Sequence, residues 1–151
     1  MNEGIAKKRL DRERALAIFY KADILEISPI EALSQEQGVS KFSAELINIY
    51  SESATKIDSI IVSSAQGWAI GRMPIIDRAI LRMEIGELLS SSETPKAVVI
   101  SEAVELASIY STDSSSRFIN GIMAAVAQEL ENVGTINDQG VQGGSDSMAL
   151  S

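Results

Sequence analysis

The sequence predicts an all-α protein with a single domain. Of its 151 residues, 45% are hydrophobic but only 5% are aromatic, and three are prolines, a composition typical of packed helices. Apolar residues recur every three or four positions along most of the chain. No stretch shows the alternation that marks a half-buried strand. A chain of this length is sufficient for one domain with a sizeable core.

The segment from Met73 to Leu89 carries most of this prediction, because its apolar residues form two helical stripes. The first stripe contains Ile76, Ala79, Ile80 and Met83, and the second contains Leu81, Ile85 and Leu88. A surface helix has one apolar stripe, so a helix with two must be covered from two sides. Its charged residues lie between the stripes, in the pairs Asp77 with Glu84 and Arg78 with Arg82. We therefore expect a central core helix, with Pro74 in its first turn.

Four helices are expected before the central one, over residues 6–25, 30–36, 41–61 and 63–71. Ser28-Pro29 ends the first helix and begins the second, which ends at Gly38. Ser40 has the side chain of an N-cap for the third helix. The fourth is short and carries Trp68, which we expect to be a packing anchor between helices rather than a binding platform.

Two helices are expected after the central one, over residues 96–110 and 115–130. Thr94 and Pro95 resemble an N-cap followed by a proline at the first helical position. Gly121 lies inside the last helical pattern, where glycine usually signals the close approach of another backbone. From residue 133 onward the chain has too little apolar surface to bury, so residues 133–151 are predicted to be a disordered tail.

The chain contains no cysteine and no histidine, which narrows the chemistry available to it. These absences exclude disulfides, thiolate zinc sites, cysteine nucleophiles, serine–histidine catalysis and histidine-ligated metals. The carboxylates are scattered, and Glu102 with Glu105 has the ordinary spacing of a solvated helix face. We therefore expect no enzyme activity, no metal and no cofactor.

Two features bear on where the protein works. No run approaches the roughly 18 to 20 apolar residues needed to span a bilayer. The N-terminus, MNEGIAKKR, lacks the apolar core of a signal peptide. We expect a cytoplasmic protein that does not associate with membranes.

Charge is distributed unevenly along the chain. The net charge is −8, but the first 14 residues carry +2 and the remainder carries −10. A basic arm on an acidic body is a recognised pattern of a terminus that contacts RNA or DNA. A solvated, frayed terminus is the alternative that charge alone leaves open.

Four segments in order resemble successive signatures of the NusB transcription antitermination family. They are Arg14–Tyr20 (RALAIFY) behind the basic start, Ile76–Leu88 (IDRAILRMEIGEL), Val98–Ala107 (VVISEAVELA) and Ser115–Ile122 (SSRFINGI). Trp68 and Arg72-Met73, just before the central helix, fit the same pattern. The resemblance covers about residues 5 to 130 and departs from the family at Ser101, where asparagine is common.

The resemblance implies about seven helices in two small helical-bundle subdomains around a shared central helix. This NusB-like domain would span residues 1–132, with residues 1–14 as its basic N-terminal arm. The resemblance also implies a non-catalytic factor that binds the boxA RNA of ribosomal RNA leaders together with NusE, a ribosomal protein. The pair would then join an RNA polymerase antitermination complex.

Site residues are implied by position within the resemblance. The RNA contacts would be Lys7, Lys8, Arg9, Arg12, Ser114, Ser115, Arg117 and Phe118, and the protein-partner contacts would include Tyr20 and Asp77. Basic side chains neutralise phosphates, and the start of the last helix offers free N–H groups to an anion. Phe118 is expected either to stack on an unpaired base or to be a core residue.

Two other functions fit the residues. One is a helical protein-binding module with no specific RNA binding, since the basic arm is modest and the body acidic. The other is a regulatory RNA-binding module related to the N-terminal domains of RNA methyltransferases, whose catalytic cysteine and glycine-rich cofactor loop this chain lacks. Both a monomer and a homodimer are compatible with the sequence.

Overall fold

A computed structural model of the chain describes residues 3–65, 69–90 and 93–142. The elements are α1 (Glu3–Leu25), α2 (Pro29–Ser34), α3 (Lys41–Glu52), α4 (Ala54–Ser64), the 3₁₀ helix η1 (Ile70–Arg72), α5 (Ile75–Leu89), α6 (Lys96–Tyr110) and α7 (Asp113–Gln142). None of the described residues forms a strand. The prediction of an all-α fold is confirmed. None of the described helices is long and apolar enough to cross a membrane.

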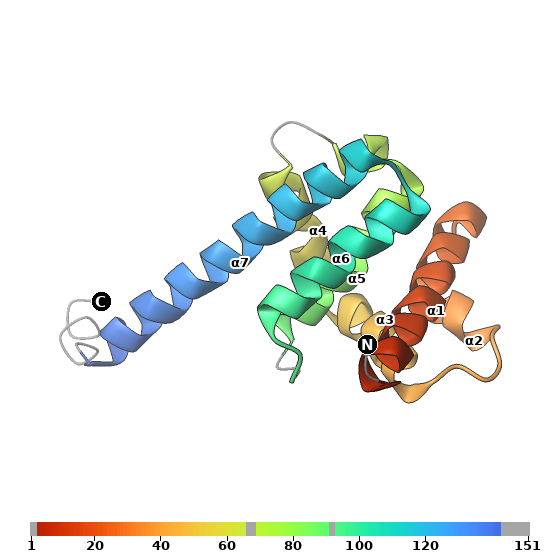
Figure 1. The fold of residues 1–151 in the computed structure, drawn as a ribbon, viewed down its shortest axis with the longest axis horizontal. Helices are drawn as coiled ribbons and strands as arrows, with labels where there is room; N and C mark the ends of the chain where they lie inside the picture. The colour runs from red at the N-terminus through yellow and green to blue at the C-terminus, as the bar shows by residue number, and fades with distance from the viewer. Residues whose placement is uncertain (1–2, 66–68, 91–92, 143–151) are drawn as a thin grey trace.

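Helix α5 occupies the centre of the molecule. It contacts α1 and α3 on one side and α4, α6 and α7 on the other. Helices α1, α2 and α3 also pack against one another, and α7 packs against α4 and α6. Figure 1 shows the first group at one end of the molecule, while α7 crosses the second group and continues away from it. The two bundles therefore share α5, as the family resemblance implies.

The two apolar stripes of α5 are both buried. Ile80 and Met83 of one stripe and Leu81 and Ile85 of the other are completely inaccessible to solvent. The core also encloses three charged side chains of this helix, which are Asp77, Glu84 and Glu87. Buried charges must be paired or neutralised, so the partners of these three carboxyl groups determine much of the molecule's chemistry.

The third predicted helix is wrong as a single element, because the chain breaks at Ser53. Helix α3 ends at Glu52 and α4 begins at Ala54, and Ser53 has φ −130° and ψ 29°. The break lets α3 pack on α1 and α2 while α4 turns to pack on α7. A change of direction at one residue preserves apolar spacing on both sides, so the periodicity does not reveal it.

Several predicted helix ends are shifted. Ser40 caps α3 as expected, since its Oγ accepts from the Ser43 N–H at 3.1 Å. Pro74 and Pro95 are the N-caps of α5 and α6 rather than first-turn residues, because their ψ angles of 140° and 143° are extended. Helix α2 ends at Ser34, before the predicted Glu36.

The predicted short helix over residues 63–71 is also revised. Helix α4 continues through Ser64, and η1 is the helical element before α5 in the described part of this segment. Trp68, the predicted packing anchor, lies outside the described residues.

Helix α7 differs from its prediction in length and in the role of its glycine. It continues to Gln142 rather than ending near residue 130. Extending a formed helix adds one hydrogen bond per residue, which offsets the weak helix propensity of this segment. Among the described residues, no other part of the chain comes within 4 Å of a Cβ built at Gly121, so the predicted close approach there is wrong. The boundary between a domain and a tail at residue 132 remains a prediction.

Candidate nucleic-acid interface

The basic start of the chain is the first part of α1 rather than a separate arm. Lys7 and Lys8 are exposed to solvent on this helix. The Nζ of Lys8 lies 5.4 Å from the centroid of the Phe42 ring at the start of α3, a cation–π contact. Both ammonium groups are therefore accessible to a polyanion.

Arg9 has an internal partner. Its Nε donates to Oε2 of Glu102 at 3.0 Å, and its Nη2 donates to Oε1 at 3.3 Å. The side chain of Arg9 is 28% exposed and that of Glu102 only 5%. The hydrogen bond with Glu102 raises the pKa of Arg9 above its usual value. Glu102, predicted to lie on a solvated face, thus joins α6 to the basic end of α1.

Arg12 is buried, with a relative exposure of 1%. Its Nε donates to Oε1 of Glu87 at 2.9 Å, and its Nη2 donates to Oε2 at 2.6 Å. Oε2 of Glu84 lies 3.7 Å from the same Nε. Burial lowers the pKa of Arg12, but these carboxylates outweigh it and the pKa is raised. The predicted RNA contact at Arg12 does not fit this geometry, because the guanidinium is enclosed and occupied.

Glu84 is enclosed in the core beside this pair. Its burial raises its pKa well above 4.5, and the neighbouring Glu87 raises it further. Arg12 lowers the pKa of Glu84, but not enough to cancel these effects. A buried carboxyl with one shared cation favours its neutral form. Arg12 therefore pairs with Glu87, and Glu84 keeps its proton at pH values at which an exposed glutamate has lost it.

The second predicted RNA segment is the start of α7, where Asp77 of α5 makes two hydrogen bonds. Ser111 donates its Oγ–H to Oδ1 of Asp77 at 2.7 Å, and Ser115 donates to Oδ2 at 2.6 Å. Asp77 and Ser115 are both buried. Thr112 caps the helix, since its Oγ1 accepts from the Ser115 N–H at 3.0 Å. Asp77, a predicted partner contact, therefore fixes where α7 begins.

The start of α7 borders a small hollow. Its volume is about 170 Å³, and it is lined by Pro74, Asp77, Ser114, Ser115 and Phe118. Ser114 and Arg117 are exposed, whereas Phe118 is half-buried and packs against the core. Phe118 therefore has the expected contact with the core and also lines the hollow, and its contact with a base stays a prediction.

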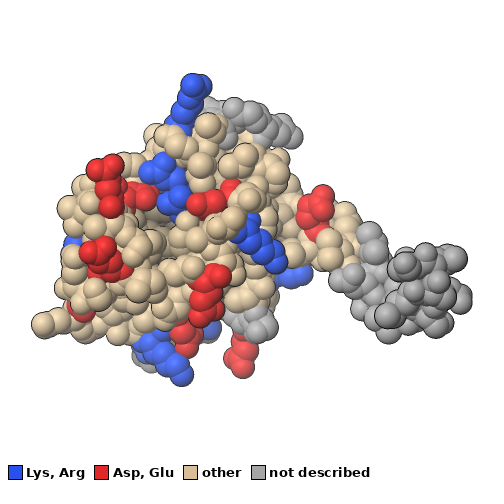
Figure 2. Space-filling view, turned by 180° about the vertical axis from the view of Figure 1, so that it is seen from behind, with Lys and Arg blue, Asp and Glu red and all other residues tan. Residues whose placement is uncertain are grey.

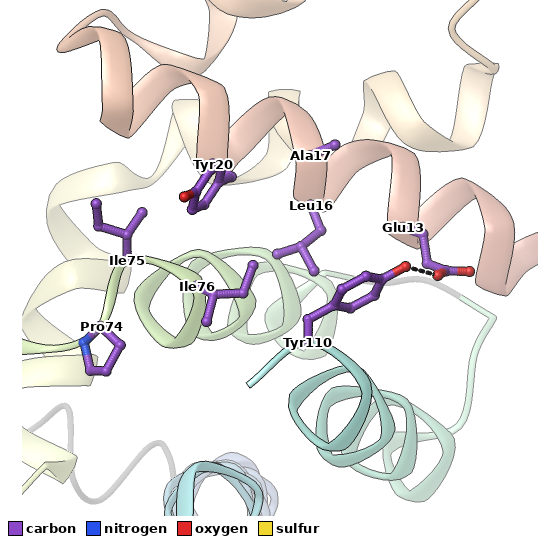
Figure 3. Close-up of a pocket in the computed structure, with 8 residues that line it drawn as sticks. All are labelled: Glu13, Leu16, Ala17, Tyr20, Pro74, Ile75, Ile76 and Tyr110. Carbon is purple, nitrogen blue, oxygen red and sulfur yellow. Dashed lines mark hydrogen bonds between the residues drawn. The ribbon is translucent and has the colours of Figure 1, made fainter. Parts of the chain in front are cut away.

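A larger hollow lies between α1 and the start of α5 (Figure 3). It has a volume of about 630 Å³ and is lined by Glu13, Leu16, Ala17, Tyr20, Pro74, Ile75, Ile76 and Tyr110. The surface is mainly apolar. Tyr20, the other predicted partner contact, is 43% exposed here. The Tyr110 hydroxyl donates to the Glu13 carboxylate at one end of the hollow.

A hydrogen bond links α1, which carries the first predicted RNA segment, to the chain just before the second segment. Glu13 follows Arg9 by one turn of α1, and Tyr110 is three residues before the start of α7. The Tyr110–Glu13 hydrogen bond therefore joins the first half of α1 to the region where α7 begins. Pro74 lines both hollows, so the two depressions adjoin.

The distribution of surface charge is mixed. Figure 2 shows basic and acidic side chains interspersed over one face of the molecule rather than gathered by sign. Among the described residues, no cluster of acidic side chains is arranged to hold a metal ion. An anion would therefore meet individual exposed cations, of which Lys7, Lys8 and Arg117 belong to the predicted segments.

Sequence reasoning missed the carboxylates that hold Arg9 and Arg12. These partners are 93 and 75 residues away in the chain, so no local spacing indicates the pairing. The sequence of the central helix contained one weak indication of buried ion pairs. Glu84 and Glu87 interrupt the apolar residues of a helix expected to be covered from two sides, where a solvated carboxylate has no place.

The family model and similar proteins of known name agree on one family. The NusB family model matches residues 9–128. The transcription antitermination protein NusB of Leifsonia xyli subsp. xyli is 38% identical over 136 residues, which cover 83% of this chain and 94% of that protein. The protein of the same name from Acidothermus cellulolyticus is 41% identical over 120 residues, covering 76% and 83%.

Solved structures share the fold. NusB of T. maritima has a TM-score of 0.72 and 27% identity, covering 80% of this chain and 90% of that one. A chain in the crystal structure of the antitermination factors NusB and NusE in complex with double-stranded RNA has a TM-score of 0.70. It covers 81% of this chain and 96% of its own length, and at 22% identity it shows the fold alone.

Proposed function

The chain belongs to the NusB family, and we propose that it is a transcription antitermination factor that binds boxA RNA together with NusE. In this role it joins transcribing RNA polymerase in the cytoplasm and catalyses no reaction. The relatives that cover most of the chain are named for antitermination. A structure of the same fold was solved with NusE and RNA. The main support is the family match over residues 9–128.

The proposed RNA contacts are the exposed groups of the two predicted segments. Lys7 and Lys8 supply accessible cations on α1, and Ser114 and Arg117 supply polar groups at the start of α7. Phe118 lines the small hollow, and we propose that its ring contacts a base there. Arg12 is assigned to the core instead, because its guanidinium is enclosed by Glu84 and Glu87.

The proposed NusE surface is the larger hollow. Its lining is mainly apolar, and Tyr20 stands at its rim with a partly exposed ring. Aromatic side chains at the centre of an interface contribute large contact area and often dominate affinity. Asp77 contributes indirectly, since its hydrogen bonds with Ser111 and Ser115 fix the neighbouring start of α7.

Titration of labelled boxA RNA, with and without NusE, tests this function by fluorescence anisotropy. We expect preference for boxA over a scrambled RNA, and a greater affinity when NusE is present. Lys8→Ala should weaken binding severalfold, because a phosphate contact is lost. Lys56→Ala is the matched control, since Lys56 is exposed on α4, which carries neither predicted segment. Equal binding of the two RNAs would remove the RNA role.

The same titration distinguishes the second candidate function, a protein-binding module without specific RNA binding. The internal pairing of Arg9 and Arg12 favours this candidate, because it leaves fewer free cations at the start of α1. It requires NusE binding through the Tyr20 hollow with no preference between boxA and scrambled RNA.

A further inference from the structure

Arg9 lies between exposed lysines and a buried acid. Lys7 and Lys8 precede it on α1 and project into solvent. The guanidinium of Arg9 instead faces Glu102 and is held by two hydrogen bonds of 3.0 and 3.3 Å. Glu13 and Glu105 add further negative charge around it. Arg9 therefore lies in a locally acidic environment, although it belongs to the basic segment.

Glu102 binds Arg9 in the way that a phosphate would. A carboxylate and a phosphate both accept two parallel N–H bonds from the guanidinium fork. An RNA phosphate that takes the Nε and Nη2 edge of Arg9 must therefore displace Glu102.

Displacement is unfavourable because Glu102 is buried. Its side chain is only 5% exposed, so loss of Arg9 would leave a desolvated carboxylate without its cation. Arg12, the nearest replacement, is already bound to Glu87 through both Nε and Nη2. The ion pair is thus more stable than an exposed pair of the same length, in which water can replace either partner.

We propose that Glu102 masks Arg9 from RNA and thereby sets the affinity of the RNA site. Arg9 can contact a phosphate only when Glu102 is displaced, so RNA phosphates first meet Lys7 and Lys8. This inference rests on the proposed function, since it concerns the strength of the same RNA site. Glu102 thereby affects RNA binding through Arg9, a role that the family resemblance does not imply.

Masking has a measurable consequence for salt dependence. Each cation that contacts a phosphate of single-stranded RNA releases counterions and contributes about 0.7 to the slope of log K against log salt. Arg9 is already neutralised by Glu102, so it contributes little to this slope. Removing the carboxylate should make the slope more negative by about 0.7.

A double-mutant cycle on the full chain tests the proposal, with boxA RNA as the probe. We expect Glu102→Gln to raise affinity by roughly three- to tenfold, because one more phosphate contact becomes available. Arg9→Ala should change the affinity of the unsubstituted protein by less than about twofold, but lower that of the Glu102→Gln variant severalfold. The slope of log K against log salt should become more negative only in the variant that carries Glu102→Gln and retains Arg9.

Glu105→Gln is the matched control. It removes the same charge from the same helix, but Glu105 is exposed and its influence on Arg9 is coulombic, without the hydrogen bonds that Glu102 makes. We expect it to change affinity by less than about twofold and to leave the effect of Arg9→Ala unaltered.

The opposite result in the double-mutant cycle would overturn the proposal. If Arg9→Ala greatly weakens the unsubstituted protein and has no effect in the Glu102→Gln background, Glu102 positions Arg9 for RNA rather than masking it. Circular dichroism melts establish that each variant folds, and Glu102→Met replaces Glu102→Gln if the latter does not. The salt slope of Arg9→Ala alone needs no change at residue 102, and a slope less negative by about 0.7 would also refute masking.

Failure of this inference is distinguishable from failure of the proposed function. If the unsubstituted protein shows no preference for boxA, the RNA role is wrong and so is masking. If it prefers boxA but the cycle shows no coupling between Arg9 and Glu102, the RNA role stands and masking alone is wrong.

Discussion

Arg12 illustrates at the scale of one residue how burial changes the meaning of a charge. Its guanidinium lies 5.3 Å from the centroid of the Phe42 ring and bonds to Glu87. Oε2 of Glu84 lies 3.7 Å from Arg12, and no other cation among the described residues lies within 4 Å of that carboxyl group. A buried ion pair adds little net stability compared with apolar packing, but removal of one partner leaves an uncompensated charge. Arg12 should therefore be essential for stability.

Arg12→Ala should lower the free energy of unfolding by about 3–5 kcal/mol, because the Glu87 carboxylate would remain buried without its cation. Urea denaturation followed by circular dichroism measures the loss. Arg14→Ala is the control, since Arg14 is exposed and lies 3.7 Å from Glu36, and it should cost less than about 1 kcal/mol. A stable Arg12→Ala protein with weakened RNA binding would return Arg12 to the RNA site.

Glu84 predicts a distinctive dependence of stability on pH. Its pKa is raised in the folded protein, so the folded state binds more protons than the unfolded state above about pH 4.5. Stability from this group is complete below that pH and is lost as pH rises toward the folded pKa. Glu84→Gln has no proton to lose at this position, so it should not share this loss of stability. The free energy of unfolding of the variant minus that of the unsubstituted protein should therefore increase between pH 5 and 7. Urea titrations at several pH values measure the difference, and a constant difference would show that Glu84 is ionised throughout.

The candidate site could be predicted only in part from its residues. The family resemblance implied the two RNA segments, and the structure places their exposed members Lys7, Lys8, Ser114 and Arg117 at the surface. The resemblance did not reveal that Arg9 and Arg12 face carboxylates. A cation appears identical in sequence whether it meets solvent or a buried acid, because that environment is determined by helix packing between distant segments.

At the scale of elements, helix α5 was predictable because its environment imposes a strong pattern. A helix packed on two sides needs apolar residues on both, and these residues are visible in the sequence as two stripes. The division between α3 and α4 had no comparable signal. Ser53 changes the direction of the chain without interrupting the apolar spacing, and only the different neighbours of the two helices explain it.

The two mid-helix glycines should respond differently to substitution. A Cβ at Gly86 of α5 would lie 3.3 Å from Cγ2 of Ile49, whereas none of the atoms described lies within 4 Å of one at Gly121 of α7. Gly121→Ala should therefore raise the free energy of unfolding by about 0.5–1 kcal/mol through helix propensity. Gly86→Ala should gain less, since Ile49 must move, and Gly86→Leu should destabilise the protein by roughly 1–3 kcal/mol.

Urea denaturation of these three variants measures the effects. The pair of alanine variants is internally controlled, because both make the same chemical change within a helix. Equal stabilisation by the two would indicate that α5 does not depend on the small size of Gly86 to approach α3.

At the scale of the whole molecule, α5 connects the two bundles and so holds the proposed binding surfaces in a fixed relation. Asp77 bonds to the start of α7, while Arg78 and Arg82 bond to Asp23 near the end of α1 at 3.2 and 3.3 Å. Arg82 also bonds to Asp58 of α4 at 3.0 Å. Polar side chains between the apolar stripes of α5 thus reach elements of both bundles. The helix has a scaffolding role in addition to its place in the core.

The proposed RNA and NusE surfaces should be separable by mutation, although α1 contributes to both. Lys8 and Tyr20 are twelve residues apart on this helix, which corresponds to roughly 18 Å at 1.5 Å per residue. That separation exceeds the Debye length of about 8 Å at physiological ionic strength, so a change at one position has little electrostatic effect at the other.

Tyr20→Ala should weaken NusE binding by roughly tenfold, as expected for an aromatic anchor, and leave the affinity for RNA alone unchanged. Lys7→Ala with Lys8→Ala should show the reverse pattern. Calorimetry with NusE and anisotropy with boxA RNA measure the two affinities, and Val62→Ala, an exposed apolar change on α4, is the control for Tyr20→Ala. Loss of both activities in either variant would mean that RNA and NusE share one surface on α1.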